Sequence, residues 1–194
     1  MGHLERRMTD YVERITGLPR DEAYRLQKRY LAEYGLTLGG LVEHHGVDPA
    51  DYHAMFDDLP LEALAQNPRL IAAIARLPGR RLIFTNANDV HAARVLAHLG
   101  LAHLFHDVFH IGLADYVPKP SLLTFQKMDA AHGIDPAVTA FFEDSERNLE
   151  PAAQLGMTTV LVGPHAPAST ASFIHHKTDN LASFLEDALL NGAA

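Results

Sequence analysis

The pattern of apolar and polar residues divides the chain into two regions with different periods. From Met8 to about Leu70, apolar residues recur at intervals of three or four positions, as in the run Tyr11, Val12 and Ile15, which is the spacing of an amphipathic helix. Glycines and proline-containing segments interrupt this pattern repeatedly. The first region is therefore expected to consist of short helices joined by tight turns.

Beyond Pro78 and Gly79 the pattern changes to short apolar runs that alternate with stretches of helical period. Short apolar runs of this kind predict buried strands, and glycines that follow the helical stretches mark helix ends. The expected strands lie at 81–86, 108–111, 139–143 and 158–162, with a weak last strand at 172–175, and the expected helices lie at about 89–98, 122–131, 149–155 and 180–190.

Strands that alternate with helices predict an α/β fold with a mainly parallel sheet and helices on both faces, which is a three-layer, Rossmann-like arrangement. We assign residues 71–194 to this core and residues 1–70 to a small all-helical domain. Ligands of such sheets bind outside the carboxyl ends of the strands, so functional side chains are expected directly after Phe84 and Phe142.

The composition narrows the class of protein. A chain of 194 residues with 47% hydrophobic residues can bury one sizeable core with a small appended domain. The net charge of −8 repels nucleic acid and anionic membranes, and the lack of cysteine excludes disulfides, thiolate metal sites and cysteine nucleophiles. The charged start differs from a signal peptide, and no window reaches the length of a membrane span. We expect a cytoplasmic protein without nucleic-acid or membrane partners.

A first candidate cluster follows the strand expected at 81–86. Thr85 and Asn86 stand at its end, and Asn88 and Asp89 stand where the next helix should begin. A hydroxyl group together with free backbone N–H groups at a helix N-terminus suits an oxyanion such as phosphate. The same residue types commonly cap helices, and for this cluster taken alone that structural alternative stays open.

Lys119 is a second candidate because it lies between Pro118 and Pro120. Two prolines restrict the backbone and hence the positions that the ammonium group can reach. A fixed positive charge suits the binding of an anion, whereas an ordinary solvated loop lysine is the simpler alternative.

A third cluster places Glu143 and Asp144 at the mouth of a buried strand, with Asn148 roughly one helical turn later. Hard oxygen ligands of this kind suit Mg²⁺. Asp144 is the expected ligand, and Glu143 and Asn148 are expected to orient the site. The structural alternative is a helix start whose acidic residues complement the helix dipole.

In this order, the three clusters resemble motifs II, III and IV of the haloacid-dehalogenase superfamily. The segments 77–86, 115–120 and 142–160 look like those of the pyrimidine 5′-nucleotidase branch, and the segment 30–41 is similar to part of the cap domain of those enzymes. The resemblance covers nearly the whole chain. It implies that the helical domain is a cap that helps to choose the substrate.

The resemblance also implies a function, namely Mg²⁺-dependent hydrolysis of nucleoside 5′-monophosphates such as UMP or CMP through an aspartyl phosphate. The expected partner is thus a small phosphorylated metabolite. By the same resemblance, the catalytic residues are Lys119 and Thr85, the phosphate-binding residues are Thr85, Asn86 and Lys119, the metal site is Asp144, Glu143 and Asn148, and the cap candidates for substrate recognition are Tyr34 and Thr37.

One motif of that family has no counterpart here. The motif Asp-x-Asp-x-Thr after an apolar strand should precede the cap and supply the nucleophile and a general acid. Asp10 is the single aspartate before Asp21, and its neighbours indicate a helix start. A sequence that begins downstream of this motif is the leading interpretation, and a naturally shortened relative is its rival.

The strand of that motif lies centrally in this fold, between the strands that end at Thr85 and Glu143. Unpaired buried peptide groups are costly, so these two strands are expected to close on each other, to recruit another segment or a second copy in a homodimer, or to leave the domain poorly stable. Two other functions stay open. One is a catalytically silent relative that binds phosphate or a nucleotide, and the other is a 2-haloacid dehalogenase, whose chemistry gives the acidic pair no role.

Overall fold

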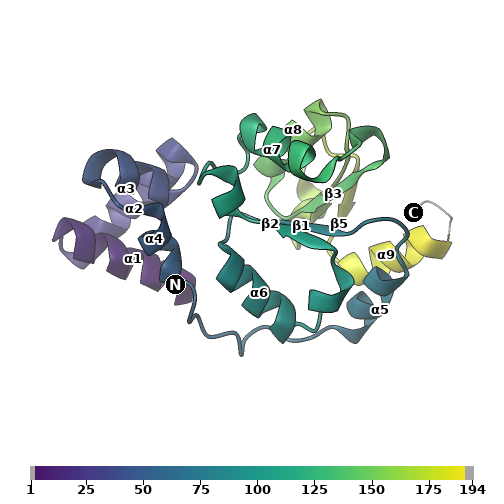
Figure 1. Ribbon diagram of the computed structural model, residues 1–194, viewed down its shortest axis with the longest axis horizontal. Coiled ribbons are helices and arrows are strands. Elements are labelled where there is room, and N and C mark those ends of the chain that lie inside the picture. Colours follow the sequence, from purple (N-terminus) through teal and green to yellow (C-terminus); the bar gives the residue numbers. More distant parts are fainter. Residues whose placement is uncertain (1–2, 191–194) are drawn as a thin grey trace.

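The computed structural model describes residues 3–190 as a helical unit beside an α/β unit (Figure 1). The helical unit has its own apolar core, formed by residues such as Tyr11, Leu26 and Leu41. Gly40 permits its close packing, because a Cβ atom there would lie 2.2 Å from Cγ of Tyr30. The unit comprises α1 (His3–Thr16), α2 (Arg20–Tyr34), α3 (Thr37–His45) and α4 (Pro49–Ala54).

The next helix, α5 (Pro68–Arg76), belongs to the α/β unit. It packs against the last helix, α9 (Leu181–Leu190), and Arg69 forms an ion pair with Glu186 across this contact. The boundary expected at residue 70 therefore falls inside α5, and the packing changes from one unit to the other in the segment before Pro68. The division into a cap and a core as functional domains stays a prediction.

All strand pairs of the α/β unit are parallel, but hydrogen bonds separate the strands into two sheets within the described residues. The first sheet pairs β1 with β2, and the second has the order β3-β4-β5. The strands are β1 (Leu82–Phe84), β2 (Asp107–Phe109), β3 (Ala140–Glu143), β4 (Thr158–Val162) and β5 (His176–Thr178).

Helices cover both faces of these strands (Figure 1). The rings of Phe141 and Phe142 point to opposite layers, as successive strand residues do: Phe141 meets Phe125 at 5.6 Å between ring centroids, and Phe142 meets Phe184 at 6.1 Å. This arrangement confirms the predicted α/β class. The remaining helices are α6 (Asp89–His98), α7 (Leu122–His132) and α8 (Glu146–Gln154), and short 3₁₀ turns lie at Ala102–Leu104, Ile111–Ala114, Pro136–Val138 and Ala166–Ala168.

Two predicted elements are misplaced. The last strand lies at His176–Thr178 rather than 172–175 because Thr159 binds the earlier segment, its carbonyl accepting a bond from the His175 N–H at 3.2 Å. Helix α8 begins at Glu146, three residues before the predicted start, because its first turn is polar and lacks the apolar period. None of the described helices combines the length and the apolar character that a membrane span requires.

Candidate active site

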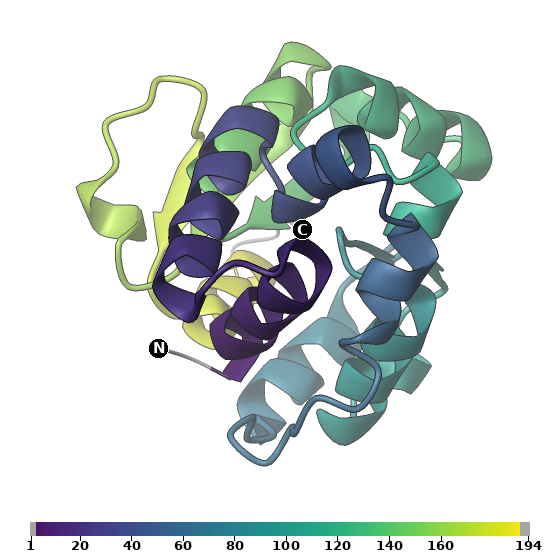
Figure 2. The same ribbon diagram turned by 90° about the vertical axis from the view of Figure 1, so that its left-hand side faces the viewer.

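The helical unit lies at the carboxyl ends of the strands, the end from which α6 and α8 start (Figures 1 and 2). Several contacts join the units around this edge. Arg147 donates from Nη2 to the carbonyl of Gly35 at 2.6 Å, and Asn88 donates from Nδ2 to Oδ1 of Asp57 at 2.7 Å. The rings of His53 in α4 and Tyr116 in the loop before Lys119 also meet there. The helical unit therefore covers the place where ligands bind in parallel α/β sheets.

Lys119 lies at the centre of this edge, with 5% of its surface exposed. Its ammonium group donates to the carbonyl of Phe84 at 2.9 Å and to Oε2 of Glu143 at 2.6 Å. The same atom lies 4.9 Å and 5.3 Å from the ring centroids of Phe84 and Phe141. Lys119 thus joins the last residues of β1 and β3, and the ordinary solvated lysine considered above is excluded.

Asn86 holds Lys119 by its backbone. The side-chain Oδ1 of Asn86 accepts a hydrogen bond from the Lys119 N–H at 2.8 Å, and its Nδ2 donates to the Lys119 carbonyl at 3.2 Å. Asn86 was predicted to bind phosphate directly, whereas this structure shows its amide engaged in positioning the lysine. The sequence around Asn86 could not predict this role, because Asn86 and Lys119 are 33 positions apart in the chain.

The loop that carries Lys119 has an unusual backbone. Asp115 and Tyr116 both have positive φ, at 51° and 60°, which non-glycine residues seldom adopt. Neighbouring contacts hold this conformation: the Tyr116 N–H donates to the Ile111 carbonyl at 3.0 Å, and the Thr124 hydroxyl donates to the Val117 carbonyl at 2.7 Å. Strained backbone that its surroundings fix in this way is common at functional sites.

Thr85 and Asn88, which follow β1, have different roles. Asn88 caps α6, since its Oδ1 accepts from the His91 N–H at 2.9 Å. The Thr85 hydroxyl accepts from the Ala87 N–H at 3.0 Å, which leaves the hydroxyl hydrogen free to donate to an anion. The capping alternative therefore holds for Asn88 and not for Thr85.

Glu143 and Asp144 form a coupled acidic pair at the end of β3. The Glu143 Oε1 accepts hydrogen bonds from the N–H groups of Asp144 and Ser145 at 3.1 Å and 3.2 Å. Burial acts to raise the pKa of Glu143, but the Lys119 ammonium and the hydrogen bonds from Asp144 and Ser145 together lower it. The pKa of Asp144 is raised, because it shares a hydrogen bond with Glu143 and is partly desolvated. A cation bound beside Asp144 would offset the mutual repulsion of these two carboxylates.

Asn148, one turn into α8, has 7% of its surface exposed. Its Oδ1 atom is buried and has no hydrogen-bond partner, which is costly for a polar atom. A cation held by Asp144 and oriented by Glu143 and Asn148 would satisfy that atom, and oxygen donors of this kind suit Mg²⁺. No cluster of three or more acidic or histidine side chains gathers for a metal within residues 3–190, so water or substrate oxygens would have to complete the coordination.

The helix-start alternative for the acidic pair does not describe Asp144. Ser145 is the N-cap residue of α8, and Glu146 is the acidic residue of its first turn. Asp144 precedes the cap and stays exposed beside Glu143.

The predicted cap residues occupy different environments. Thr37 is buried in the core of the helical unit, where its hydroxyl donates to the Gln27 carbonyl at 3.3 Å. Tyr34 bonds to Nε2 of His44 at 2.8 Å and directly precedes Gly35, the residue that Arg147 contacts. The structure therefore brings the Tyr34 end of α2 toward α8 and keeps Thr37 inside the helical unit.

Sequence reasoning missed His53, a residue of α4 at the contact between the units. Its ring lies 5.8 Å from that of Tyr116, between centroids, and 4% of the residue is exposed. Neither ring nitrogen has a hydrogen-bond partner, and burial lowers the pKa of His53 to about 4. Nothing in the sequence separates it from the other twelve of the thirteen histidines. Arg147 was missed as well, because its partner is a backbone carbonyl far away in the chain.

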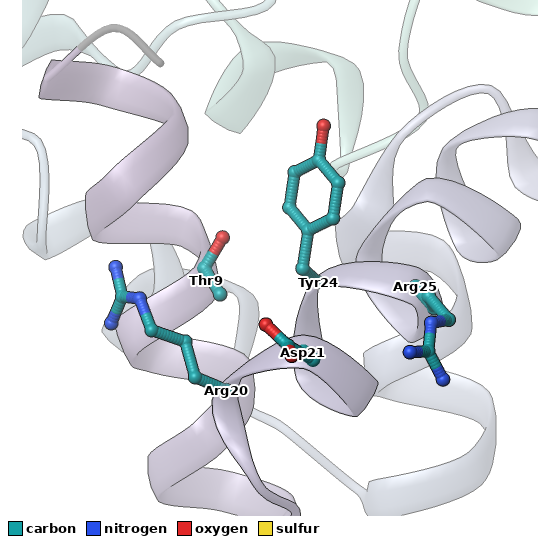
Figure 3. A pocket seen from close by; sticks show the side chains of 5 residues that line it. All are labelled: Thr9, Arg20, Asp21, Tyr24 and Arg25. Atoms are coloured by element: carbon teal, nitrogen blue, oxygen red, sulfur yellow. The ribbon is translucent and has the colours of Figure 1, made fainter.

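A hollow on the helical unit lies between α1 and α2, and its charged residues are shown in Figure 3. Arg20 is paired there with Asp10 and Glu13, and Arg25 points away from the other side chains. Asp10 is thus exposed on the surface of α1 and engaged with an arginine.

A sequence profile of haloacid dehalogenase-like hydrolases matches residues 7–156, more than half of the chain. The chain belongs to the haloacid dehalogenase-like hydrolases. The family predicted from the three motifs is therefore confirmed. Its pyrimidine 5′-nucleotidase branch stays a prediction.

An individual relative of this haloacid dehalogenase-like hydrolase has a low sequence identity to it. Phosphate metabolism protein 8 of Saccharomyces cerevisiae is 28% identical over 174 residues, which cover 81% of this chain and 54% of that protein. The chain therefore spans about half the length of this curated relative.

Two solved structures illustrate the shared fold. A HAD phosphatase from Thermococcus onnurineus has a TM-score of 0.61 and 20% identity, over 97% of this chain and 89% of the other. L-2-haloacid dehalogenase from Xanthobacter autotrophicus has a TM-score of 0.58 and 17% identity, over 98% and 94%. At such identities the likeness supports the fold alone, and the fold is common to a phosphatase and a dehalogenase.

Proposed function

We propose that this haloacid dehalogenase-like hydrolase acts on phosphomonoesters in a Mg²⁺-dependent reaction, with nucleoside 5′-monophosphates as substrates. The observation that supports this most is the placement of the Lys119 ammonium between the Phe84 carbonyl and Glu143, at the same edge as the free hydroxyl hydrogen of Thr85. A buried cation and a donor at one edge of a parallel sheet suit the oxygens of a phosphoryl group.

The carboxylates of Glu143 and Asp144 place negative charge at the same edge. Phosphate and carboxylates repel each other, so a cation between them is needed for both to share the site. Mg²⁺ bound at Asp144 would supply that charge and neutralise the charge that develops on the phosphoryl oxygens. The unpartnered Oδ1 of Asn148 and the raised pKa of Asp144 fit such a cation. A dehalogenase would leave both features without a role.

Hydrolysis through an aspartyl phosphate needs a carboxylate that attacks phosphorus, expels the alcohol, and is then regenerated by water with release of phosphate. Glu143 is unsuited to this role, because Lys119 and two backbone N–H groups engage its oxygens. Asp144 is assigned to the cation. The nucleophile in this proposal is therefore an aspartate supplied to the Lys119 edge by a further segment.

The choice of a nucleotide rests on the position of the helical unit. That unit covers the strand ends, and its α2–α3 turn contacts α8 through Gly35 and Arg147. A substrate bound by phosphate at Lys119 would extend toward this turn, and the half-buried ring of Tyr34, which contacts Tyr30 and His44, is the proposed contact for its base. UMP and CMP are the proposed substrates because the three motifs resemble the pyrimidine 5′-nucleotidase branch.

Binding and turnover should be tested separately. Calorimetric titration of the protein with UMP is expected to show binding that EDTA abolishes. The Asp144→Asn variant should lose most of its affinity for UMP, and its remaining binding should no longer depend on Mg²⁺. Lys119→Met should weaken binding by roughly 10- to 100-fold, the effect of one charged hydrogen bond. Glu150→Gln, an exposed change on α8, is the matched control and should leave binding unchanged.

Phosphate release is then measured with the same proteins. Absence of Mg²⁺-dependent UMP binding in the unaltered chain would refute the proposal, and halide release from 2-chloropropionate without Mg²⁺ would establish the dehalogenase alternative. UMP binding that never leads to phosphate release would identify a catalytically silent relative.

A further inference from the structure

The end of α4 is attached to the α/β unit along one face of α6. The side chains of Asn88, His91 and Arg94 share that face because they are three positions apart. Arg94 donates from Nη2 to the Leu59 carbonyl at 3.1 Å, and Nδ1 of His91 lies 3.1 Å from the Phe56 carbonyl. The backbone carbonyls bound in this way are those of His53, Phe56, Asp57 and Leu59. We call this attachment the α6 contact.

The α6 contact continues along the linker between the two units. Nε2 of His98 lies 2.9 Å from the Leu64 carbonyl, and Gln66 donates from Nε2 to the His98 carbonyl at 2.8 Å. The linker is therefore bound at both ends of α6. The end of α4, from which the linker starts, cannot leave this helix without breaking several hydrogen bonds together.

A second attachment lies on α8, where Arg147 donates from Nη2 to the Gly35 carbonyl at 2.6 Å. This hydrogen bond is exposed, whereas those of Asn88, His91 and Arg94 are partly buried. Water can replace either partner of an exposed bond, so its rupture leaves no buried polar group unpaired. The α2–α3 turn at Gly35 is therefore more easily released than the end of α4. We call this second attachment the α8 contact.

Arg147 supplies a charge that α2 lacks. The last turn of α2 contains no basic residue, although the carbonyl groups at a helix C-terminus carry partial negative charge and need partners. The guanidinium of Arg147 provides such a partner from the other unit. Gly35 suits this position because its φ of 80° is unfavourable for residues with a side chain. The α8 contact is thus electrostatically matched as well as exposed.

The α8 contact also lies beside the candidate metal site. Arg147 is in the first turn of α8 and directly precedes Asn148, whose Oδ1 atom lacks a partner. On the opposite side of the contact, Gly35 directly follows Tyr34. One hydrogen bond therefore sets the position of the Tyr34 end of α2 relative to the helix that starts at the acidic pair.

We propose that Arg147 is a positioning residue, which holds the Tyr34 end of the helical unit over the acidic edge while the α6 contact serves as the pivot about which the unit turns when this bond breaks. The pivot and the role of the α8 contact are independent of the proposed function. The consequence for nucleotides rests on that function: Arg147 should favour UMP over inorganic phosphate, because phosphate alone does not reach the α2–α3 turn.

The motion is tested first, with spin labels on the full chain. The sequence contains no cysteine, so introduced pairs carry the labels at defined places. Ala32→Cys with Gln154→Cys spans the α8 contact, and Ala54→Cys with Ala97→Cys spans the α6 contact; all four positions are exposed. Arg147→Met is expected to lengthen and broaden the distance distribution of the first pair and to leave that of the second pair unchanged.

Binding is then measured by calorimetry with Mg²⁺. Arg147→Met should lower the affinity for UMP roughly 5- to 10-fold, the effect of one hydrogen bond, and change the affinity for inorganic phosphate by less than about 2-fold. Arg147→Lys keeps the charge and one donor and should restore part of the UMP affinity. Tyr34→Leu should weaken UMP binding in the unaltered protein and have little further effect in Arg147→Met. Arg76→Met, an exposed arginine of α5, is the control and should change neither affinity.

An unchanged distance across the α8 contact in Arg147→Met, or an equal change across the α6 contact, would overturn the proposal. Equal losses of UMP and phosphate affinity would also overturn it, because Arg147 would then act through its charge alone. The expected distance changes in a protein that does not bind UMP would support the pivot and refute the proposed function. UMP binding with unchanged distances would support that function and refute the pivot.

Discussion

Removing one partner of the ion pair between Lys119 and Glu143 should strongly reduce the free energy of unfolding. Both side chains are nearly buried, at 7% and 9% exposure. Lys119→Met leaves the Glu143 carboxylate without its counter-ion, and Glu143→Gln leaves the ammonium with the Phe84 carbonyl and two rings as its remaining partners. Removal of one partner of a buried pair costs about 3 to 5 kcal/mol of unfolding free energy.

The double variant Lys119→Met/Glu143→Gln carries no unpaired charge. It should therefore be more stable than either single variant and lose no more than about 2 kcal/mol relative to the unaltered protein. The free energy of coupling between the two residues is then at least about 4 kcal/mol, which is large for a contacting pair.

Urea unfolding followed by circular dichroism measures all four proteins at one pH and salt concentration. The exposed pair of Arg20 and Asp10 provides the control cycle, with side chains 47% and 58% exposed. Its coupling should stay below about 1 kcal/mol. Single-variant losses that simply add in the double variant would refute the argument, because they would show that neither charge depends on the other for its burial.

Three further predictions concern stability. His53 has its pKa lowered to about 4 by burial, so the unfolded chain takes up a proton that the folded chain does not, and stability should fall by up to about 3 kcal/mol as the pH decreases from 6.5 to 4; His53→Leu should remove this part of the pH dependence in urea titrations. Phe125→Ala should cost about 3 to 5 kcal/mol because the ring is fully buried, whereas Val138→Ala, at 83% exposure, should change stability by less than about 0.5 kcal/mol in the same assay. Gly40→Ala should lower the melting temperature by pushing α3 away from Tyr30, and an unchanged melting temperature would contradict the close approach of the two helices.

Much of the α/β unit could be predicted because its signals are local. The apolar run 158–162 is the strand β4 with the predicted bounds, and the helix expected at 89–98 begins after its capping residue Asn88. Where the local signal was polar, prediction failed, as in the first turn of α8 and in the short strand His176–Thr178. Both elements are held by their neighbours rather than by their own apolar pattern.

The candidate site shows the same limit. The order of Thr85, Lys119 and Asp144 along the chain was sufficient to identify the family, because each stands after a strand or in a rigid loop. The use of Asn86 as a clamp and the burial of Thr37 could not be predicted, since both depend on contacts between segments distant in the sequence.

The clamp between Asn86 and Lys119 has a mechanical consequence. Because the Asn86 side chain bonds to both the N–H and the carbonyl of Lys119, the loop after β1 and the loop that carries the ammonium should move together. Any displacement of β1 is then transmitted to the positive charge. A substitution that shifts the end of β1 should therefore also change the affinity of Lys119 for anions, even where the substituted residue lies outside the anion site.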